Sequence, residues 1–258
     1  MSYRKLELTS RNAVVIGGTS GIGLTIAKGL AQAGANVIAT GRRANLVEAA
    51  AEDIRKSGVK SLAIPCDVAD AASLEAVLQG ATKEWGGVDI LVNSAGITKR
   101  TPTLEVAQSE WNSILDTNLS GTLRSCQIFG RQMVERRYGR IINIGSIASM
   151  LALYEVAAYC ASKAAVAALT KSLAIEWAKS GVCVNAILPG VFRTDINAKL
   201  LDGTARGAEF LLRTPMGRFG QLEELAGAAV FLASEAASFV TGHLLAVDGG
   251  ILASGVNQ

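Results

Sequence analysis

Residues 12–33, NAVVIGGTSGIGLTIAKGLAQA, decide the fold, because a short apolar run at 12–16 leads through a glycine-rich turn into a helical pattern at 24–33. Strand, glycine turn and helix in this order are typical of α/β units that bind phosphate, since the N-terminus of a helix favours negative charge. The glycines let the backbone approach a pyrophosphate, although the spacing is GxxxGxG rather than GxGxxG, and such a turn alone also fits a tight connection. The turn supplies six predicted cofactor-binding residues: Gly17, Thr19, Ser20, Gly21, Ile22 and Gly23.

Strand and helix patterns alternate along the whole chain. Strands are predicted at 12–16, 36–40, 61–65, 88–92, 139–144, 182–188 and 244–247, and helices at 24–33, 46–57, 71–85, 109–135, 157–180 and 222–232. This order predicts one domain over residues 1–258, a Rossmann-type doubly wound parallel sheet of about seven strands with helices on both faces and ligands at the carboxyl ends of the strands. Residues 192–215 lose periodicity apart from one short helix near 196–201, so we expect a substrate loop at about 190–215.

The residues after the second and third predicted strands bear on the cofactor. An acid after the second strand would bind the ribose hydroxyls of NAD, whereas Arg42 and Arg43 stand there and suit a 2′-phosphate. The sequence therefore predicts NADP(H), although two arginines at a solvated helix start would look the same. Asp67, followed by Val68, could accept a hydrogen bond from an adenine amino group or cap the helix that starts near Ala71.

The helix predicted at 157–180 holds Tyr159 and Lys163 four residues apart, which places the phenol and the ammonium on one face. A cation about 4 Å away in an effective dielectric of about 20 stabilises a phenolate by roughly 4 kcal/mol, or at most about three pKa units. Tyr159 is therefore predicted to act as a general acid or base near pH 7. A lone YxxxK also fits a core tyrosine with a lysine that reaches solvent.

Polar or small residues also stand where other predicted elements end or break. Asn118 and Gly121 interrupt the helical pattern at 109–135, and a mid-helix asparagine indicates a local kink or a specific polar task. Ser146 follows the strand predicted at 139–144. Small residues that leave room for a flat ring or a ribose follow the strand at 88–92: Asn93, Ser94, Ala95 and Gly96.

Composition argues against several classes of function. His243 is the only histidine and no GxSxG elbow is present, which argues against a Ser/His/Asp hydrolase and against a multi-histidine metal site. The four cysteines lack CxxC spacing and are predicted to be reduced core thiols. A net charge of +3 without long runs of like charge argues against nucleic acid binding. With no signal-peptide core and no membrane span, we expect a soluble, cytoplasmic protein.

In combination these motifs resemble the short-chain dehydrogenase/reductase family over essentially the whole chain. The resemblance rests on the glycine turn at 17–23, Asp67-Val68, Asn93-Ser94-Ala95-Gly96, Asn118, Ser146, Tyr159-x-x-x-Lys163, and Pro189-Gly190 with Thr194. Ile16 and Ser94 depart from the threonine and asparagine that the family commonly has there. Besides the turn, the resemblance implies cofactor contacts from Arg42, Arg43, Asp67, Val68, Asn93, Ala95, Gly96, Tyr159, Lys163, Pro189, Gly190, Val191 and Thr194.

The same resemblance implies a metal-free interconversion of an alcohol and a ketone. Ser146 would donate a hydrogen bond to the substrate carbonyl, and Tyr159 would exchange a proton with the substrate oxygen. Lys163 would lower the pKa of the tyrosine and hold the nicotinamide ribose, and Asn118 would anchor a water that relays protons to solvent. The family is commonly tetrameric, so a homotetramer is expected.

The expected substrate loops look most like those of the gluconate 5-dehydrogenase type of sugar-acid and polyol oxidoreductase. This resemblance lies in residues 97–100, 192–197 and 213–220. Lys99, Arg100 and Arg193 suit a sugar-acid carboxylate such as that of gluconate or 5-ketogluconate, although loop cations are also ordinary surface. Glu155 beside the same pocket would repel an anion. The alternatives are a 3-oxoacyl-thioester (acyl-carrier-protein) reductase and a non-catalytic NADP-binding sensor or scaffold, which would be expected to have lost one of the four catalytic residues.

Overall fold

Six parallel strands form one sheet in the part of the chain described by the structure, a computed structural model that covers residues 3–194 and 197–255. They are β1 (Asn12–Ile16), β2 (Asn36–Thr40), β3 (Ile90–Asn93), β4 (Gly139–Ile144), β5 (Val182–Pro189) and β6 (Leu244–Val247). Their order across the sheet is β2-β1-β3-β4-β5-β6, so the winding reverses between β1 and β3. The carboxyl ends of strands at such a switch point form a crevice for ligands. The predicted doubly wound fold is confirmed.

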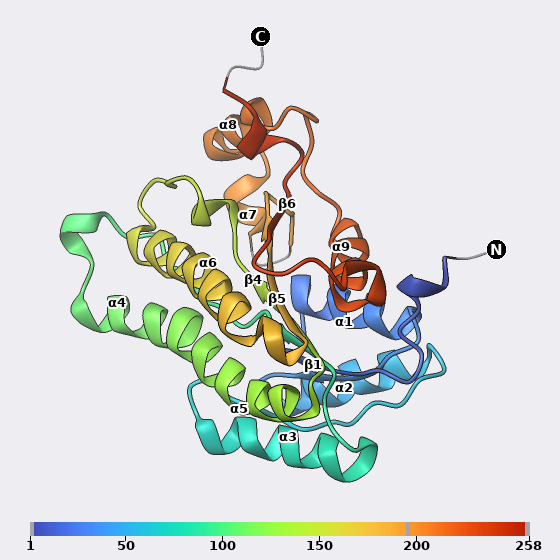
Figure 1. Ribbon diagram of the computed structural model, residues 1–258. Helices are drawn as coiled ribbons and strands as arrows, with labels where there is room; N and C mark the ends of the chain where they lie inside the picture. The colour runs from blue at the N-terminus through green and yellow to red at the C-terminus, as the bar shows by residue number, and fades with distance from the viewer. Residues whose placement is uncertain (1–2, 195–196, 256–258) are drawn as a thin grey trace.

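Helices cover both faces of the sheet (Figure 1). One face carries α1 (Gly21–Gln32), α2 (Ala44–Arg55) and α9 (Glu224–Ala233), and the other carries α3 (Ala71–Trp85), α5 (Gly121–Arg136) and α6 (Ala157–Trp177). Alternate residues of β1 serve the two cores: Ala13 and Val15 pack with the first set of helices, and Val14 and Ile16 with the second. Because β1 is buried on both faces, side chains on either face must be apolar, and this explains its continuous hydrophobic run in the sequence.

The strand predicted at residues 61–65 is absent from the sheet. The segment lies beside β2, where the Val37 amide donates to the Lys60 carbonyl at 3.1 Å. In the same stretch, however, side chains take the place of main-chain partners, because Ser61 Oγ donates to the Val37 carbonyl at 2.7 Å and Thr40 Oγ1 donates to the Ile64 carbonyl. Pro65 also lacks an N–H to add to a ladder. The described chain therefore has six strands where about seven were predicted.

The helix predicted at 71–85 is confirmed as α3. Asp70 is its N-cap residue, since its carboxylate accepts a hydrogen bond from the Ala72 amide at 3.0 Å. Gly86 ends the helix with φ +81. The capping role considered for Asp67 thus belongs to Asp70, and the Asp67 carboxylate accepts from the Ala69 amide at 3.0 Å instead.

The long helical pattern at 109–135 is broken where the sequence indicated a kink. α4 (Gln108–Leu115) is followed by a π-helical turn at Asp116–Ser120 and then by α5. A π turn inserts an extra residue into the helical hydrogen-bond pattern and is frequent at functional sites. Asn118 is fully buried within this turn. Gly121 follows it and packs against Val68, whose Cγ2 would lie 2.8 Å from a Cβ at that position.

The segment after β5 contains more helix than the sequence predicted. α7 (Ala198–Leu201) confirms the short helix expected near 196–201, although residues 195 and 196 lie outside the described chain. α8 (Ala205–Arg213) was not predicted. Short 3-10 turns occur at Arg4–Leu6, Thr103–Glu105, Ile147–Ser149, Ala178–Ser180, Glu235–Ala237 and Ile251–Ala253. Within the described residues, the longest apolar helices fall short of what a bilayer crossing requires.

Candidate active site

The glycine turn between β1 and α1 packs tightly on the loop after β3. Gly17 has φ +78, and a Cβ there would lie 2.6 Å from the Ala95 backbone nitrogen. A Cβ at Gly23 would lie 2.1 Å from the Gly17 carbonyl oxygen, so both positions require glycine. Gly21 has φ +51, and the nearest described atom to a Cβ there is Thr194 Cγ2 at 3.9 Å. The turn thus faces the loop after β3 and the segment after β5.

The end of β2 lies beside the same turn. A Cβ at Gly41 would lie 3.0 Å from the Thr19 hydroxyl oxygen. Arg42 and Arg43 follow directly, and both are exposed. Neither guanidinium forms an ion pair with another described residue. Their donors are therefore available to an anion next to the turn, as a 2′-phosphate contact requires.

Asn118 joins the loop after β3 to α6. Its Oδ1 accepts the Ile97 amide at 2.8 Å, and its Nδ2 donates to the Ile97 carbonyl at 2.9 Å and to Ser162 Oγ at 3.0 Å. A Cβ at Gly96 would lie 3.4 Å from Asn118 Oδ1 and 3.5 Å from Lys163 Nζ. The structure therefore brings Asn118, Gly96 and Lys163 together, and the buried amide has the polar task that its position in the sequence suggested.

Ser146 lies at the end of β4 and starts a 3-10 turn. Its Oγ accepts the Ala148 amide at 3.1 Å, and its own amide donates to Ser149 Oγ at 3.3 Å. Ser149 Oγ in turn donates to the Lys163 carbonyl at 2.8 Å, which ties the turn to α6. Ser149 was not predicted as a site residue, although the S-x-x-S spacing at 146–149 resembles a capping box.

The Ser146 hydroxyl lies near enough to the Tyr159 phenol to lower its pKa, so the structure brings the predicted pair together. Burial raises the pKa of Tyr159, and Ser146 offsets part of that rise. Lys163 Nζ lies 5.7 Å from the centre of the Tyr159 ring and donates to the Ile144 carbonyl at 2.7 Å. Burial lowers the pKa of Lys163 to about 8.

In the protein without cofactor, burial rather than Lys163 dominates the pKa of Tyr159, so the lowering by Lys163 stays a prediction for the phenolate formed in turnover. Lys163 is only 6 % exposed, and the loss of water around its ammonium disfavours the charged form. Its ammonium is directed at a main-chain carbonyl, and the net effect of the surroundings on Tyr159 is to favour the neutral phenol.

Asn93 is one predicted cofactor residue whose side chain does not reach the cleft. It is buried in β3, where Oδ1 accepts from Ser125 Oγ at 2.7 Å and Nδ2 donates to Asn143 Oδ1 at 2.9 Å. Asn143 continues the chain of bonds to Thr170 Oγ1 at 2.9 Å. The amide of Asn93 therefore links β3, β4, α5 and α6 inside the core, since a buried polar group needs partners there.

Gly190 packs against the turn that follows β6. A Cβ there would lie 2.6 Å from Asp248 Cα, so the segment after β5 lies against the C-terminal turn. Phe192 forms an isolated parallel bridge with Gly220, which fastens the base of the expected substrate loop. Val191 accepts the Gly220 amide at 2.9 Å.

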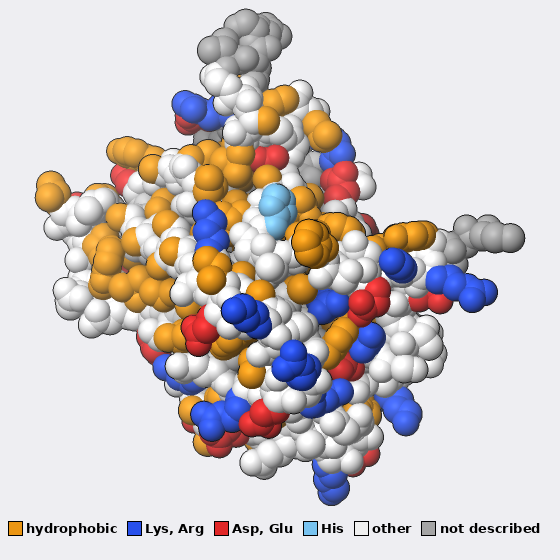
Figure 2. All heavy atoms as spheres, viewed as in Figure 1, with side chains coloured by type: hydrophobic (Ala, Val, Ile, Leu, Met, Phe, Trp, Pro, Cys, Tyr) orange, Lys and Arg blue, Asp and Glu red, His pale blue; other side chains and the backbone are white. Residues whose placement is uncertain are grey.

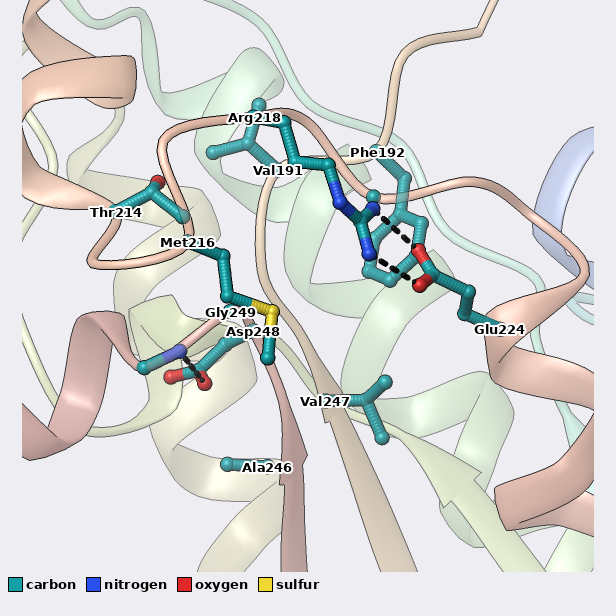
Figure 3. A pocket seen from close by; sticks show the side chains of 12 residues that line it. Val191, Phe192, Thr214, Met216, Arg218, Glu224, Ala246, Val247, Asp248 and Gly249 are labelled. Atoms are coloured by element: carbon teal, nitrogen blue, oxygen red, sulfur yellow. Dashed lines mark hydrogen bonds and ion pairs between the residues drawn. The ribbon is translucent and has the colours of Figure 1, made fainter.

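A cavity of about 300 Å³ lies where these segments meet (Figure 3). Arg218 faces Glu224 beside it, with nitrogen–oxygen distances of 2.6 and 2.9 Å, so both charges are balanced within the protein. The lining residues are Val191, Phe192, Thr214, Met216, Arg218, Gly220, Glu224, Ala246, Val247, Asp248, Gly249 and Gly250. None of the four predicted catalytic residues is among them, so this cavity is separate from the Ser146–Tyr159 pair.

The cations predicted to bind a substrate carboxylate are already ion-paired. Lys99 Nζ lies 2.6 Å from Glu110 Oε2, and Arg193 binds Asp202 through Nε and NH2 at distances of 2.7 to 3.1 Å. Arg100 Nε donates to Glu155 Oε2 at 2.6 Å. The expected repulsion of an anion by Glu155 is therefore reduced by Arg100, and each of the three cations would have to leave an ion pair to bind a substrate carboxylate.

Comparison with known proteins agrees with this geometry. Residues 17–252 match the family described as Enoyl-(Acyl carrier protein) reductase. Over 258 residues the chain is 41 % identical to Gluconate 5-dehydrogenase of Gluconobacter oxydans, a match that covers 98 % of the chain and 100 % of the relative. The chain belongs to the short-chain dehydrogenase/reductase family. The predicted family and its oxidoreductase class are confirmed.

Two other relatives bear on the choice of substrate. The chain resembles the crystal structure of a gluconate 5-dehydrogenase from Burkholderia cenocepacia in complex with NADP and tartrate, with a TM-score of 0.93, 40 % identity, and coverage of 97 % of this chain and 98 % of that one. It is also 41 % identical over 246 residues to 3-oxoacyl-[acyl-carrier-protein] reductase of Escherichia coli, covering 95 % of this chain and 99 % of the relative. Similarity of sequence alone therefore leaves both substrate classes open for this family member.

Proposed function

We propose that this family member is an NADP(H)-dependent oxidoreductase that interconverts a secondary alcohol and a ketone on a sugar acid, with gluconate and 5-ketogluconate as the pair. The observation that carries the proposal is the grouping of Ser146, Tyr159 and Lys163 on a scaffold that holds Lys163 and Asn118 beside the loop after β3. A hydroxyl and a phenol close together can share one substrate oxygen.

The described residues fit a bound NADP(H). Ser20 at the N-cap of α1 makes no capping hydrogen bond, so its hydroxyl and the first amides of the helix can bind a phosphate. Gly17 and Gly21 keep the turn free of side chains, and Arg42 and Arg43 suit the 2′-phosphate. When bound, the nicotinamide supplies or accepts the hydride. Among the other predicted contacts, Ala95, Gly96, Lys163 and Thr194 also border this cradle.

Ser146 and Tyr159 have different roles toward the substrate oxygen. Because Ser146 Oγ already accepts the Ala148 amide, its own O–H can donate to the substrate oxygen. Burial raises the pKa of Tyr159, so the phenol is protonated at neutral pH and serves as the acid when a ketone is reduced. In oxidation the same oxygen must act as the base.

Lys163 and Asn118 support the tyrosine. The bond from Lys163 Nζ to the Ile144 carbonyl fixes the ammonium near the Tyr159 ring, where it stabilises a phenolate formed in turnover. Both N–H donors of the Asn118 side chain are used by Ile97 and Ser162, and Oδ1 accepts the Ile97 amide, so a relay water could bind this side chain only through the second lone pair of Oδ1.

The alternative substrate is a 3-oxoacyl thioester on an acyl carrier protein. Sequence similarity to the Escherichia coli reductase supports it. The charge pattern favours the sugar acid, because Lys99, Arg100 and Arg193 are paired and do not form the open basic patch that an acidic carrier protein requires. A non-catalytic sensor or scaffold would have no use for the Ser146–Tyr159 pair.

We further propose that the protein is a cytoplasmic homotetramer whose substrate loop spans residues 190–215. Hydrophobic side chains gather over α6 in Figure 2, and Ile175 on that helix is 82 % exposed. Leu123 on α5 is also exposed. Apolar groups on these two helices support an interface with another copy. Sedimentation of the purified protein tests the assembly.

The function is tested by following nicotinamide absorbance with a substrate panel. The purified protein would be assayed with D-gluconate, 5-ketogluconate, neutral polyols and a 3-oxoacyl thioester, each with NADP(H) and NAD(H). We expect the highest kcat/KM for the gluconate pair with NADP(H). Turnover of the thioester alone would replace the sugar-acid assignment by the alternative, and no turnover of any alcohol or ketone would contradict the enzyme proposal itself.

A further inference from the structure

Three segments meet beside the loop that leads into the catalytic helix. The Thr101 amide donates to the Glu155 carbonyl at 2.9 Å, which joins the loop after β3 to the loop before α6. Arg206 on α8 donates from NH1 to the Tyr154 carbonyl at 3.4 Å, which joins α8 to the same loop. We call residues 97–101, residues 150–156 and α8 the rim. Because residues 150–156 run directly into the first turn of α6, the rim is linked to Tyr159 through a few residues of chain.

The charges of the rim are balanced with one exception. Lys99 is paired with Glu110 and Arg100 with Glu155, each at 2.6 Å. On α8 itself Arg213 Nε lies 3.0 Å from Glu209 Oε1. Arg206 has no carboxylate partner among the described residues, and its guanidinium carbon lies 5.5 Å from the centre of the Phe210 ring. Arg206 therefore gives the rim a positive charge that the described chain does not neutralise.

The donors of Arg206 are also largely unused. A guanidinium presents five N–H groups in a planar fork that matches a carboxylate. Within the described residues only NH1 of Arg206 has an acceptor, and that bond to the Tyr154 carbonyl is long at 3.4 Å. Contact with the Phe210 ring restricts the plane of the fork. The side chain is half-buried, so it is partly ordered before any ligand arrives.

We propose that Arg206 binds the carboxylate of the substrate and thereby makes the enzyme prefer sugar acids to neutral polyols. The inference rests on the proposed function and names the residue that recognises the acid. Gluconate reacts at C5 and carries its carboxylate at C1, so the group that binds the carboxylate belongs at the rim rather than beside Tyr159. Neutral polyols lack the group that Arg206 binds.

Arg100 is a poorer choice for this task. To bind a substrate it would have to leave Glu155 at 2.6 Å, which exchanges one carboxylate for another. Glu155 has φ +61, an unusual conformation for a residue other than glycine, and the Thr101 amide holds its carbonyl. The Arg100–Glu155 pair thus holds the two loops together, whereas Arg206 gives up only a long bond when it turns to a ligand.

The test measures binding rather than turnover. L-tartrate and D-gluconate would be titrated by calorimetry into wild-type protein saturated with NADP, and into Arg206→Gln, Arg206→Lys and Arg213→Gln prepared in the same way. We expect Arg206→Gln to raise the dissociation constants of both carboxylates roughly 10- to 100-fold, as for the loss of a charge-assisted bond. Arg206→Lys, which keeps the charge and loses the fork, should fall between. Arg213→Gln makes the same charge change on the same helix, but the Arg213 guanidinium is already paired with Glu209, so this variant should lose less affinity than Arg206→Gln.

Three results would overturn the inference: equal dissociation constants for wild type and Arg206→Gln, an equal loss in Arg213→Gln, or no carboxylate binding by the wild type. Parallel kinetics with D-gluconate and D-glucitol separate this inference from the proposed function. If the wild type binds carboxylates through Arg206 but does not oxidise gluconate, the substrate assignment fails and the role of Arg206 stands. If it oxidises gluconate equally well with and without Arg206, only the role of Arg206 fails. Thermal unfolding of each variant confirms that α8 is still packed.

Discussion

Lys163 Nζ donates a hydrogen bond to the carbonyl of Ile144 at 2.7 Å, which ties the catalytic helix α6 to the end of β4. Ser146 lies two residues beyond Ile144 and close to Tyr159 on the first turn of α6. The end of β4 thus meets α6 at two places, at Ile144 with Lys163 and at Ser146 with Tyr159. The lysine therefore has a positioning role that the spacing of Tyr159 and Lys163 in the sequence does not reveal.

Replacing Tyr159 with phenylalanine removes the proton donor and leaves the ring. Because Ser146 alone cannot supply a proton at neutral pH, we expect Tyr159→Phe to lower kcat roughly 10²- to 10⁴-fold. The affinity for NADPH, measured by fluorescence titration, should stay unchanged. Tyr138→Phe is a matched control, since the Tyr138 hydroxyl donates to Glu235 at 2.9 Å and takes no part in the proposed chemistry. Near-normal turnover in Tyr159→Phe would remove the phenol from the mechanism.

The preference for NADP(H) should depend on the arginine after β2. Arg42 is exposed, lies next to the glycine turn and has no ion-pair partner in the described chain. We expect Arg42→Ser to weaken NADPH binding about 10- to 100-fold through loss of a charge-assisted contact with the 2′-phosphate. NADH binding should not change, because NADH lacks that phosphate. Arg131→Ser, an exposed arginine on α5, should leave both constants at wild-type values. Similar affinities of the wild type for NADPH and NADH would contradict the prediction.

Local patterns predicted most elements because each depended on its own residues. α3 has an aspartate at its N-cap and a glycine with φ +81 at its end, so both boundaries follow from the sequence. α8 was missed because its nine residues follow Gly203 in a segment where periodicity is interrupted. The strand predicted at 61–65 failed because the hydroxyls of Ser61 and Thr40 replace main-chain partners, and their contacts depend on the neighbouring segment.

In the candidate site, too, local sequence patterns predicted some features, and contacts between distant segments determined the others. Tyr159, Lys163 and Ser146 could be found because they stand at fixed places on predicted elements, and the structure brings them together. The pairing of Arg100 with Glu155 joins residues that are 55 positions apart, and no local pattern reveals it. The amide of Asn93 turns into the core for a similar reason, because its partners Ser125 and Asn143 come from other elements.

Asn118 should contribute to both stability and turnover. Asn118→Ala leaves the Ile97 amide and carbonyl and the Ser162 hydroxyl without this partner, so we expect the free energy of unfolding to fall by about 1–3 kcal/mol or more. Turnover should fall as well, since the loop after β3 loses its attachment to α6. Asn118→Asp keeps the acceptor for the Ile97 amide but places a carboxylate oxygen against the Ile97 carbonyl in a fully buried position, so it should lose at least as much stability. Urea unfolding measures both variants against Asn112→Ala, which alters an exposed asparagine on α4. A loss of stability equal to that of the control would contradict the role of Asn118 in joining the loop after β3 to α6.

Lys163 should make the stability of the cofactor-free protein depend on pH in a direction fixed by its lowered pKa. Burial lowers the pKa of Lys163 from 10.5 to about 8, so between these values the unfolded chain binds more protons than the folded one. The free energy of unfolding due to Lys163 therefore rises with pH through that window, and below about pH 8 the folded protein bears the full cost of the buried charge.

Buried thiols act in the opposite direction, because burial raises the pKa of Cys126 to about 12, but they are common to wild type and variant. We therefore compare urea unfolding of the wild type with Lys163→Met. The difference in unfolding free energy, wild type minus variant, should rise by roughly 2 kcal/mol between about pH 7 and about pH 9.5. Lys171→Met, which removes an exposed lysine on the same helix, is the control for the loss of one positive charge. A difference for Lys163→Met that changes with pH no more than that of the control would mean that the buried amine titrates near its ordinary value, and that the Ile144 carbonyl compensates for the loss of water around the charge.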